Sequence, residues 1–178
     1  METVLDFLGF ATVAGTVWNA VSYAAFIVII IGVYSERHRN TLITLGAAVL
    51  ALYAGIFLKN PLFATLQTLI VISGLLKLTK FSRRISMAAI ILLTAAAYAI
   101  LYGGGVITDT WSLMGSFGLL GIALGLATLP RRYGFILMAI GGLFLIAYAF
   151  QVSVWVFFLL NIFFAIANIQ AWQKPESK

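Results

Sequence analysis

The polar side chains of this chain that could act on another molecule are uncharged amides and aromatic rings within apolar segments. No Asp, Glu or His lies in the interior of an apolar stretch, and the chain contains no cysteine. Membrane enzymes and proton relays normally carry ionisable groups at such positions. Paired carboxylates, a nucleophile with its base, and metal ligand sets are therefore all missing. The sequence predicts no enzyme, no cofactor and no metal site, and leaves solute binding through hydrogen bonds and ring stacking.

Three amides are the strongest candidates for contacts with a solute. An amide left in hydrocarbon without a partner costs roughly 2–7 kcal/mol, so we expect these side chains to face the protein interior. Asn161 and Asn168 are seven residues apart and share one helix face. Gln67 follows Pro61 by six residues, which places it deep in its segment. With the nearby aromatics, the predicted solute-binding residues are Gln67, Asn161, Asn168, Trp18, Asn19, Tyr23, Tyr53 and Tyr148.

Each of these residues also has a purely structural interpretation. Asn and Gln in membrane helices often bond a neighbouring helix and do nothing else. Tryptophans near the end of a span, such as Trp18, anchor helices at the lipid headgroups. Both interpretations stay open at this point.

The composition is that of a membrane protein. Hydrophobic residues make up 63% of the chain and charged residues 9%, with a mean hydropathy of +1.09, far from soluble composition. A bilayer-crossing helix needs about 20 mostly apolar residues. The stretches that meet this requirement are 13–33, 41–58, 61–80, 85–102, 108–128, 133–150 and 152–173. The sequence therefore predicts an all-α membrane protein with seven transmembrane helices.

Charge predicts the orientation of these helices. The net charge of +6 lies in short clusters between apolar runs, which is typical of orienting charge and not of nucleic-acid binding. Of the 11 Lys and Arg residues, all except Lys59 fall on one side if the C-terminus is inside. Glu2, Asp6 and Asp109 then lie outside with it. We expect a protein of the plasma (inner) membrane with its N-terminus outside and its C-terminus cytoplasmic.

An internal repeat organises the chain. A gapless shift of 93 positions brings hydrophobic stretches, basic loops and polar breaks into coincidence, with Trp18 on Trp111 (111 − 18 = 93) and Arg39 on Arg132 (132 − 39 = 93). At this shift Asn161 falls on Thr68, so Gln67 is offset by one position. Three spans leave the chain on the opposite side, so one extra crossing is needed before a parallel copy can start. We predict two parallel three-helix repeats, 1–82 and 105–178, joined by a linker helix in 83–104 (3+1+3).

The first twelve residues are predicted to form a short outer segment. A single helix from 1 to 33 would be about 50 Å long, too long for one span. Gly9 and Gly15 mark the expected bend. The absence of an early basic residue argues against a cleaved signal peptide.

The arrangement of three spans, a linker and three spans resembles that of the SWEET sugar transporters, the KDEL receptors and the PnuC vitamin carriers. No proline lies mid-span and no Pro-Gln motif occurs, which favours PnuC over SWEET. The third span of each half is similar to the corresponding PnuC helix: Leu66-Gln67 precedes Gly74, and Ala171-Trp172 precedes Gln173-Lys174. The resemblance, which extends to small inner-membrane relatives of the same topology, implies facilitated diffusion of a flat, uncharged or weakly charged ring compound.

The sequence thus predicts a passive carrier for a small polar or aromatic metabolite, such as a vitamin precursor or nucleoside. The alternative is a non-transporting receptor or structural subunit. The expected partners are a small-molecule solute and the lipid bilayer, with a homo-oligomer allowed and no nucleic acid.

Overall fold

The computed structural model describes residues 13–35, 37–79, 81–128 and 131–173, and their secondary structure is helical throughout. The helices are α2 (Val13–Tyr34), α3 (Arg39–Leu52) with a π-helical end η1 (Tyr53–Phe57), α4 (Pro61–Leu78), α5 (Arg83–Gly103), α6 (Thr110–Thr128), α7 (Arg132–Gln151) and α8 (Trp155–Gln173). All seven are long and apolar enough to cross a membrane. The predicted all-α fold is confirmed, and so are seven helices of membrane-spanning length and hydropathy.

The expected bend at Gly15 is wrong, because Gly15 continues α2 without a break. Gly15 is buried in the structure. The other residues predicted for the outer segment, Gly9 included, lie outside the described part of the chain.

Two helices on the same side of the molecule begin at side-chain caps. The Asn60 side chain accepts a hydrogen bond from the Phe63 N–H at 3.1 Å, and Pro61 occupies the first turn of α4, where its missing N–H costs nothing. Asp109 Oδ1 accepts from the N–H groups of Ser112 and Trp111, each at 2.8 Å. The hydrogen bond from the Ser112 N–H is the main reason that the pKa of the Asp109 carboxyl lies below its usual value.

The loops that follow α3 and α7 are alike. Lys59 and Ser153 both adopt the left-handed backbone conformation, with φ of 50° and 54°, and they are 94 residues apart (153 − 59 = 94). Arg39 and Arg132 begin α3 and α7 at the expected spacing of 93. Pro61 and Trp155, however, begin α4 and α8 with a spacing of 94 (155 − 61 = 94). The spacing of the helix starts therefore changes from 93 to 94 residues, because α7 is one residue longer than α3 with its π-helical end.

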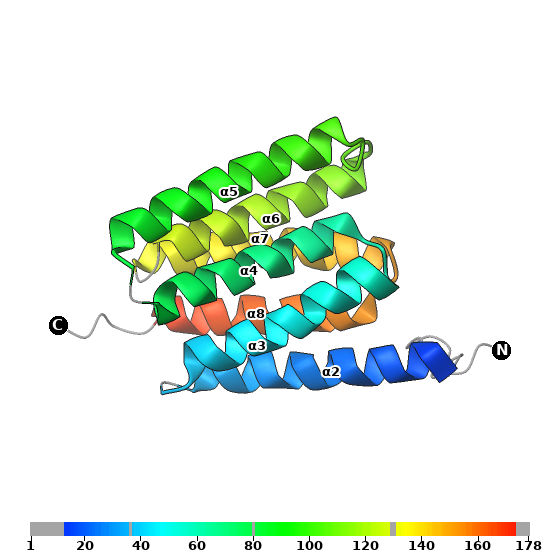
Figure 1. Cartoon of the computed structure of the whole chain (residues 1–178), viewed down its shortest axis with the longest axis horizontal. Coiled ribbons are helices and arrows are strands. Elements are labelled where there is room, and N and C mark those ends of the chain that lie inside the picture. The colour runs from blue at the N-terminus through cyan, green and yellow to red at the C-terminus, as the bar shows by residue number, and fades with distance from the viewer. Residues whose placement is uncertain (1–12, 36, 80, 129–130, 174–178) are drawn as a thin grey trace.

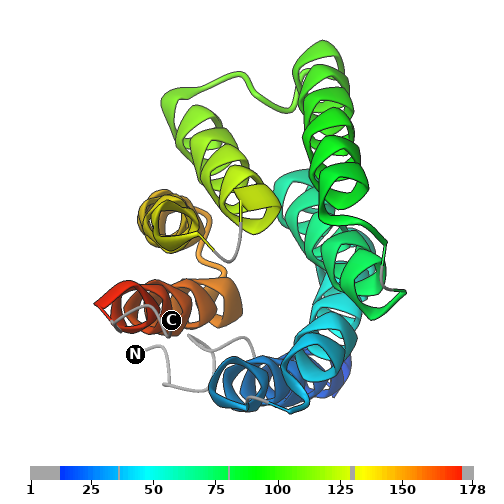
Figure 2. The same ribbon diagram turned by 90° about the vertical axis from the view of Figure 1, so that its left-hand side faces the viewer.

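Six of the helices form a ring. Neighbouring helices in sequence pack together within α2–α3–α4 and within α6–α7–α8, and contacts of α4 with α6 and of α2 with α8 close the ring (Figures 1 and 2). In the described part of the chain, α5 contacts α4 and α6 alone and stands outside the ring. Its large side chains are mostly exposed, as expected for a helix with one face in lipid.

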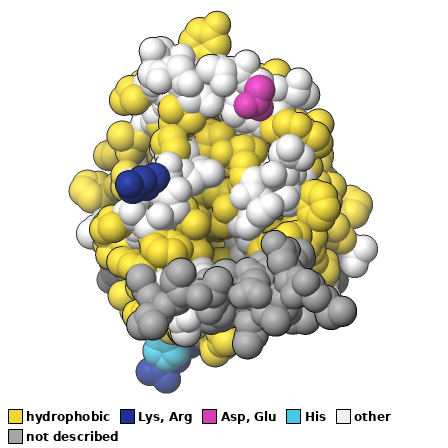
Figure 3. Space-filling model, turned by 90° about the vertical axis from the view of Figure 1, so that its right-hand side faces the viewer, with side chains coloured by type: hydrophobic (Ala, Val, Ile, Leu, Met, Phe, Trp, Pro, Cys, Tyr) yellow, Lys and Arg dark blue, Asp and Glu magenta, His cyan; other side chains and the backbone are white. Residues whose placement is uncertain are grey.

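The two ends of the ring differ in charge. We call the basic end the one where α2 ends and α3 begins, at the left of Figure 1; its described basic side chains are Arg37, Arg39, Lys77, Arg84, Arg131 and Arg132. The opposite end, which faces the viewer in Figure 3, shows mostly apolar and neutral atoms. Lys59 and Asp109 are the charged residues of its described loops.

The tightest helix pair, α6 and α7, depends on glycine. A Cβ on Gly141 would lie 2.7 Å from the carbonyl oxygen of Gly118 and 2.7 Å from the amide nitrogen of Ile122. Both neighbours are backbone atoms, which cannot move aside as a flexible side chain does. Small residues at such positions let membrane helices approach closely.

Gly141→Ala should therefore destabilise the protein, because it forces α6 and α7 apart; overpacking of this kind costs about 1–3 kcal/mol. Thermal melting in a mild detergent measures the effect. Gly103→Ala is the matched control, since a Cβ on Gly103 meets nothing within 4 Å. If both variants melt with the parent, close contact of the two backbones is not what holds this pair together.

Candidate functional site

The ring encloses a cavity of about 700 Å³, a volume typical of a small-molecule site. All six ring helices contribute to its lining. The lining runs from Arg39, Asn40 and Lys77 at the basic end inward to Gln67 and Asn161. Ten residues of helix separate Gln67 from Lys77, so the cavity reaches about 15 Å into the ring.

The three amides singled out in the sequence line this one cavity. Asn161 and Asn168 each donate Nδ2 to the carbonyl oxygen four residues earlier, of Phe157 and Phe164, at 2.7 Å. Each therefore turns its Oδ1 away from that bond as a free acceptor. Gln67 is 1% exposed, and its Oε1 is buried without a hydrogen-bond partner in the described structure. The three amides thus keep unused hydrogen-bonding capacity in the cavity wall, as donors and as acceptors.

The one-residue change in register brings the amides into correspondence. With the spacing of 94 that relates the starts of α4 and α8, Gln67 falls on Asn161 (161 − 67 = 94), and the offset expected from the gapless shift disappears. The same spacing relates further cavity-lining pairs of α4 and α8, namely Leu66 and Leu160, Ile70 and Phe164, Ser73 and Ala167, Gly74 and Asn168, and Lys77 and Ala171.

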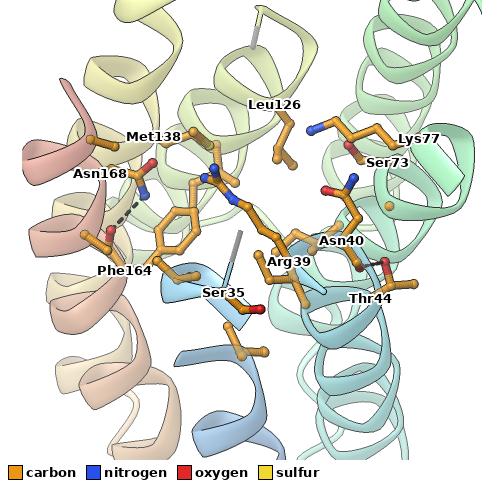
Figure 4. A pocket seen from close by; sticks show the side chains of 18 of the residues that line it. Ser35, Arg39, Asn40, Thr44, Ser73, Lys77, Leu126, Met138, Phe164 and Asn168 are labelled. Carbon is orange, nitrogen blue, oxygen red and sulfur yellow. Dashed lines mark hydrogen bonds between the residues drawn. The ribbon is translucent and has the colours of Figure 1, made fainter. Parts of the chain in front are cut away.

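Three cations that the sequence analysis treated only as orienting charges also line the cavity, namely the exposed Arg37, Arg39 and Lys77. Figure 4 shows the side chains of Arg39, from the start of α3, and Lys77, from the last turn of α4, reaching into it. A signal for Lys77 was present in the sequence, because residues 67, 70, 74 and 77 follow one helix face. For Arg39, at a helix start beside a loop, no comparable pattern exists.

Aromatic rings lie one helical turn beyond the inner end of the cavity lining. Phe63 of α4 and Phe157 of α8 are both fully buried, and their rings stack with centroids 4.2 Å apart at an angle of 7°. Each lies one helical turn before a cavity amide, Gln67 and Asn161 respectively. Tyr148 packs against Phe63, and its hydroxyl accepts a hydrogen bond from Asn60 Nδ2 at 3.0 Å. We call Phe63, Phe157, Tyr148 and Asn60 the aromatic floor.

The other five predicted site residues are not in the cavity lining. The Tyr53 hydroxyl donates to Asn19 Oδ1, and Trp18 stacks on Phe57 with centroids 6.0 Å apart. Tyr148 belongs to the aromatic floor, and the partly buried Tyr23 packs against the hydrophobic core. The structure thus brings together Gln67, Asn161 and Asn168, and places Trp18, Asn19, Tyr23, Tyr53 and Tyr148 elsewhere.

The described residues contain no group of three His, Cys, Asp or Glu side chains that could hold a metal ion. No protein-family model, curated protein or solved structure matches this chain. The class that fold and composition define is a protein of seven helices that are long and apolar enough to cross a membrane, with a largely apolar cavity inside its ring of helices that also contains amides and cations.

Gln67→Leu should leave the melting temperature unchanged or raise it. A buried acceptor without a partner costs about 1–3 kcal/mol, and Leu removes it at similar volume. Asn60→Leu should instead lower the stability by about 1–3 kcal/mol, because it removes both the bond to Tyr148 and the cap of α4. Melting in detergent compares the two. A loss at Gln67 as large as that at Asn60 would show that Gln67 holds helices together.

Proposed function

We propose that the protein is a passive membrane carrier for a small polar metabolite, and that the cavity is its solute site. The observation that carries this proposal is the buried, unpartnered Oε1 of Gln67 in the cavity wall. An acceptor kept without a partner costs stability, and a ligand that donates a hydrogen bond to it would recover that cost. A residue selected only for helix packing has no such reason to be there.

The finer architecture is part of the proposal: two parallel three-helix repeats within 1–82 and 105–178, with a linker helix in 83–104. Cavity-lining positions of α2 recur in α6 at a spacing of 93 residues. The pairs are Ile29 with Ile122, and Val33 with Leu126. Cavity-lining positions of α4 recur in α8 at a spacing of 94 residues. A cavity that receives equivalent positions from both halves lies on the axis that would relate them, as in carriers built from parallel repeats.

The two ends of the cavity support a carrier more than a static bundle. On the inner side, the halves are joined by the Phe63–Phe157 stack and the Asn60–Tyr148 hydrogen bond. At the basic end, the side-chain hydrogen bond that joins α2 to α8 in the described residues is long, at 3.4 Å from the Tyr34 hydroxyl to Gln170 Oε1. A carrier held shut at one end and loosely joined at the other would expose its site to one side at a time.

We place the basic end in the cytoplasm, following the positive-inside rule. The N-terminus is then outside, the C-terminus inside, and the membrane is the plasma (inner) membrane. In this orientation the cavity belongs to an inward-facing state. Passive transport needs no coupling ion, in keeping with a cavity lining that holds no carboxylate or histidine among the described residues.

The alternative is a receptor or structural subunit that does not transport, and the resemblance to PnuC carriers favours transport over it. A receptor binds from one side and never opens the aromatic floor. Access to the cavity from both sides of the membrane therefore separates the two functions without knowledge of the solute.

The chain has no cysteine, so a single introduced thiol reports access directly. Ile70 lines the cavity and is partly exposed. We expect Ile70→Cys in membrane vesicles to react with a membrane-impermeant maleimide from either side, because a carrier opens alternately to both. Ile91→Cys, on the lipid-facing side of α5, is the control and should stay unlabelled. Labelling of Ile70→Cys from the basic end alone would contradict transport and favour the receptor.

A further inference from the structure

Two positive charges share the mouth of the cavity. Arg39 and Lys77 come from neighbouring helices, and both side chains reach into the same space (Figure 4). Like charges placed together repel, and in the described structure neither has a carboxylate or hydrogen-bond partner to offset the repulsion. An anion between them would be held by both.

Arg37 also lines the cavity but is exposed, whereas Arg84, Arg131 and Arg132 at the same end lie outside the cavity lining. Arg132, the counterpart of Arg39 at a spacing of 93, donates Nη2 and Nε to the Trp172 carbonyl oxygen at 2.8 and 3.2 Å. Arg84 is exposed and is not part of the cavity lining. The counterpart of Lys77 at a spacing of 94 is Ala171. Charges that only orient a membrane protein stay at the interface, so the inward direction of Arg39 and Lys77 needs a separate cause.

Deeper in the cavity the polar groups change from cations to uncharged amides and a hydroxyl. Gln67 Oε1 is buried and unpartnered, and Asn161 donates one N–H to the Phe157 carbonyl, which leaves its Oδ1 and its second N–H for other partners. Ser73 Oγ, between these two levels on α4, is also buried without a partner in the described residues. Apolar side chains such as Ile70 and Phe164 line the space between the two polar levels.

We propose that the cavity binds a small organic anion end-on, with its carboxylate or phosphate between Arg39 and Lys77 at the mouth. Gln67 and Asn161 accept hydrogen bonds from N–H or O–H groups at its inner end, and the apolar wall covers the ring or chain between them. The proposal names the substrate class of the carrier and so rests on the proposed function. It narrows the flat, uncharged or weakly charged ring compound that the sequence resemblance implied to one that carries an anionic group.

The probe is 4-aminobenzoate, which carries a carboxylate at one end of a flat ring and an amine donor at the other. Its neutral counterpart is 4-aminobenzamide, and benzoate lacks the donor. Binding is measured as the shift in melting temperature in a neutral detergent, at constant ionic strength. We expect 4-aminobenzoate to bind at least about 10-fold more tightly than either counterpart, because each loses a charged or buried hydrogen bond.

Charge-removing variants locate the site. Lys77→Gln and Arg39→Gln should each weaken 4-aminobenzoate binding by about 10- to 100-fold, the loss typical of a hydrogen bond to a charged group. Arg84→Gln removes the same charge from the same end outside the cavity and should bind like the parent. The proposal is overturned if 4-aminobenzamide binds as well as the anion, or if the cavity variants match Arg84→Gln. It is also overturned if neither 4-aminobenzoate nor inorganic phosphate at about 10 mM shifts the melting temperature, since that concentration saturates a millimolar site.

A lipid headgroup carries the same anionic chemistry as a free metabolite. Nanodiscs of phosphatidylcholine alone and of phosphatidylcholine with phosphatidylglycerol distinguish the two sources. If the free anion is the ligand, 4-aminobenzoate binds equally in both. If phosphatidylglycerol displaces it from the parent, the same cations hold the lipid phosphate, which supports the anion site and assigns the headgroup as its source.

The anion-binding experiment and the Ile70→Cys labelling experiment can fail independently. The first measures binding at equilibrium, and the second measures access to the cavity from each side of the membrane. If the anion binds but Ile70→Cys is labelled from one side alone, the anion site is supported and the carrier function is contradicted. If Ile70→Cys is labelled from both sides but no anion binds, the carrier function is supported and the anion site is contradicted.

Discussion

The constraint on which this structure depends is that hydrocarbon cannot solvate an amide. The bilayer supplies no hydrogen bonds, so every polar group must be satisfied within the protein or face enclosed water. Thr68 meets this demand locally, through a bond from its hydroxyl to the Ala64 carbonyl at 2.8 Å. Gln67, one position earlier, has no such bond and is enclosed by the ring instead. The ring of six helices therefore follows from where the amides must go.

The same constraint explains why the ring is closed at the Phe63–Phe157 stack and open at the basic end. A stacked aromatic pair excludes water without polar atoms of its own, so Phe63 and Phe157 can seal the centre of an apolar protein. Asn60 then joins the halves beside that seal while capping α4. At the basic end, long cationic side chains border a space that water can enter. The molecule is thus tightly joined at one level and open at the other.

Much of the fold could be predicted from the sequence, because length and hydropathy alone define spans. The convergence of Gln67, Asn161 and Asn168 was also predictable, since the cost of an unpaired amide points each of them inward. The rotation of each helix about its own axis could not be predicted from the sequence. In a membrane helix both faces are apolar, so little in the pattern distinguishes the face that meets lipid from the one that meets protein. For this reason Trp18 and Tyr53 could be placed in the right helices but not in relation to the cavity.

The inward direction of Arg39 and Lys77 was hidden for a different reason. Basic residues at span ends already have an explanation in the positive-inside rule, so their number carries no information about a site. The change of register from 93 to 94 was equally hidden, because one residue added within an apolar helix leaves the hydropathy profile unaltered. Both features required the three-dimensional arrangement.

The central claim is that one end of the ring opens as the other closes. Double electron–electron resonance spectroscopy in lipid measures the width of each end of the ring. One pair of spin labels is placed at Asn40 and Tyr133 on the basic end, and the other at Leu58 and Val152 on the opposite end. The account predicts that Asn60→Leu, which weakens the closed end, lengthens the Leu58–Val152 distance and shortens the Asn40–Tyr133 distance. A change confined to the Leu58–Val152 pair, or one fixed distance at each end, would contradict it.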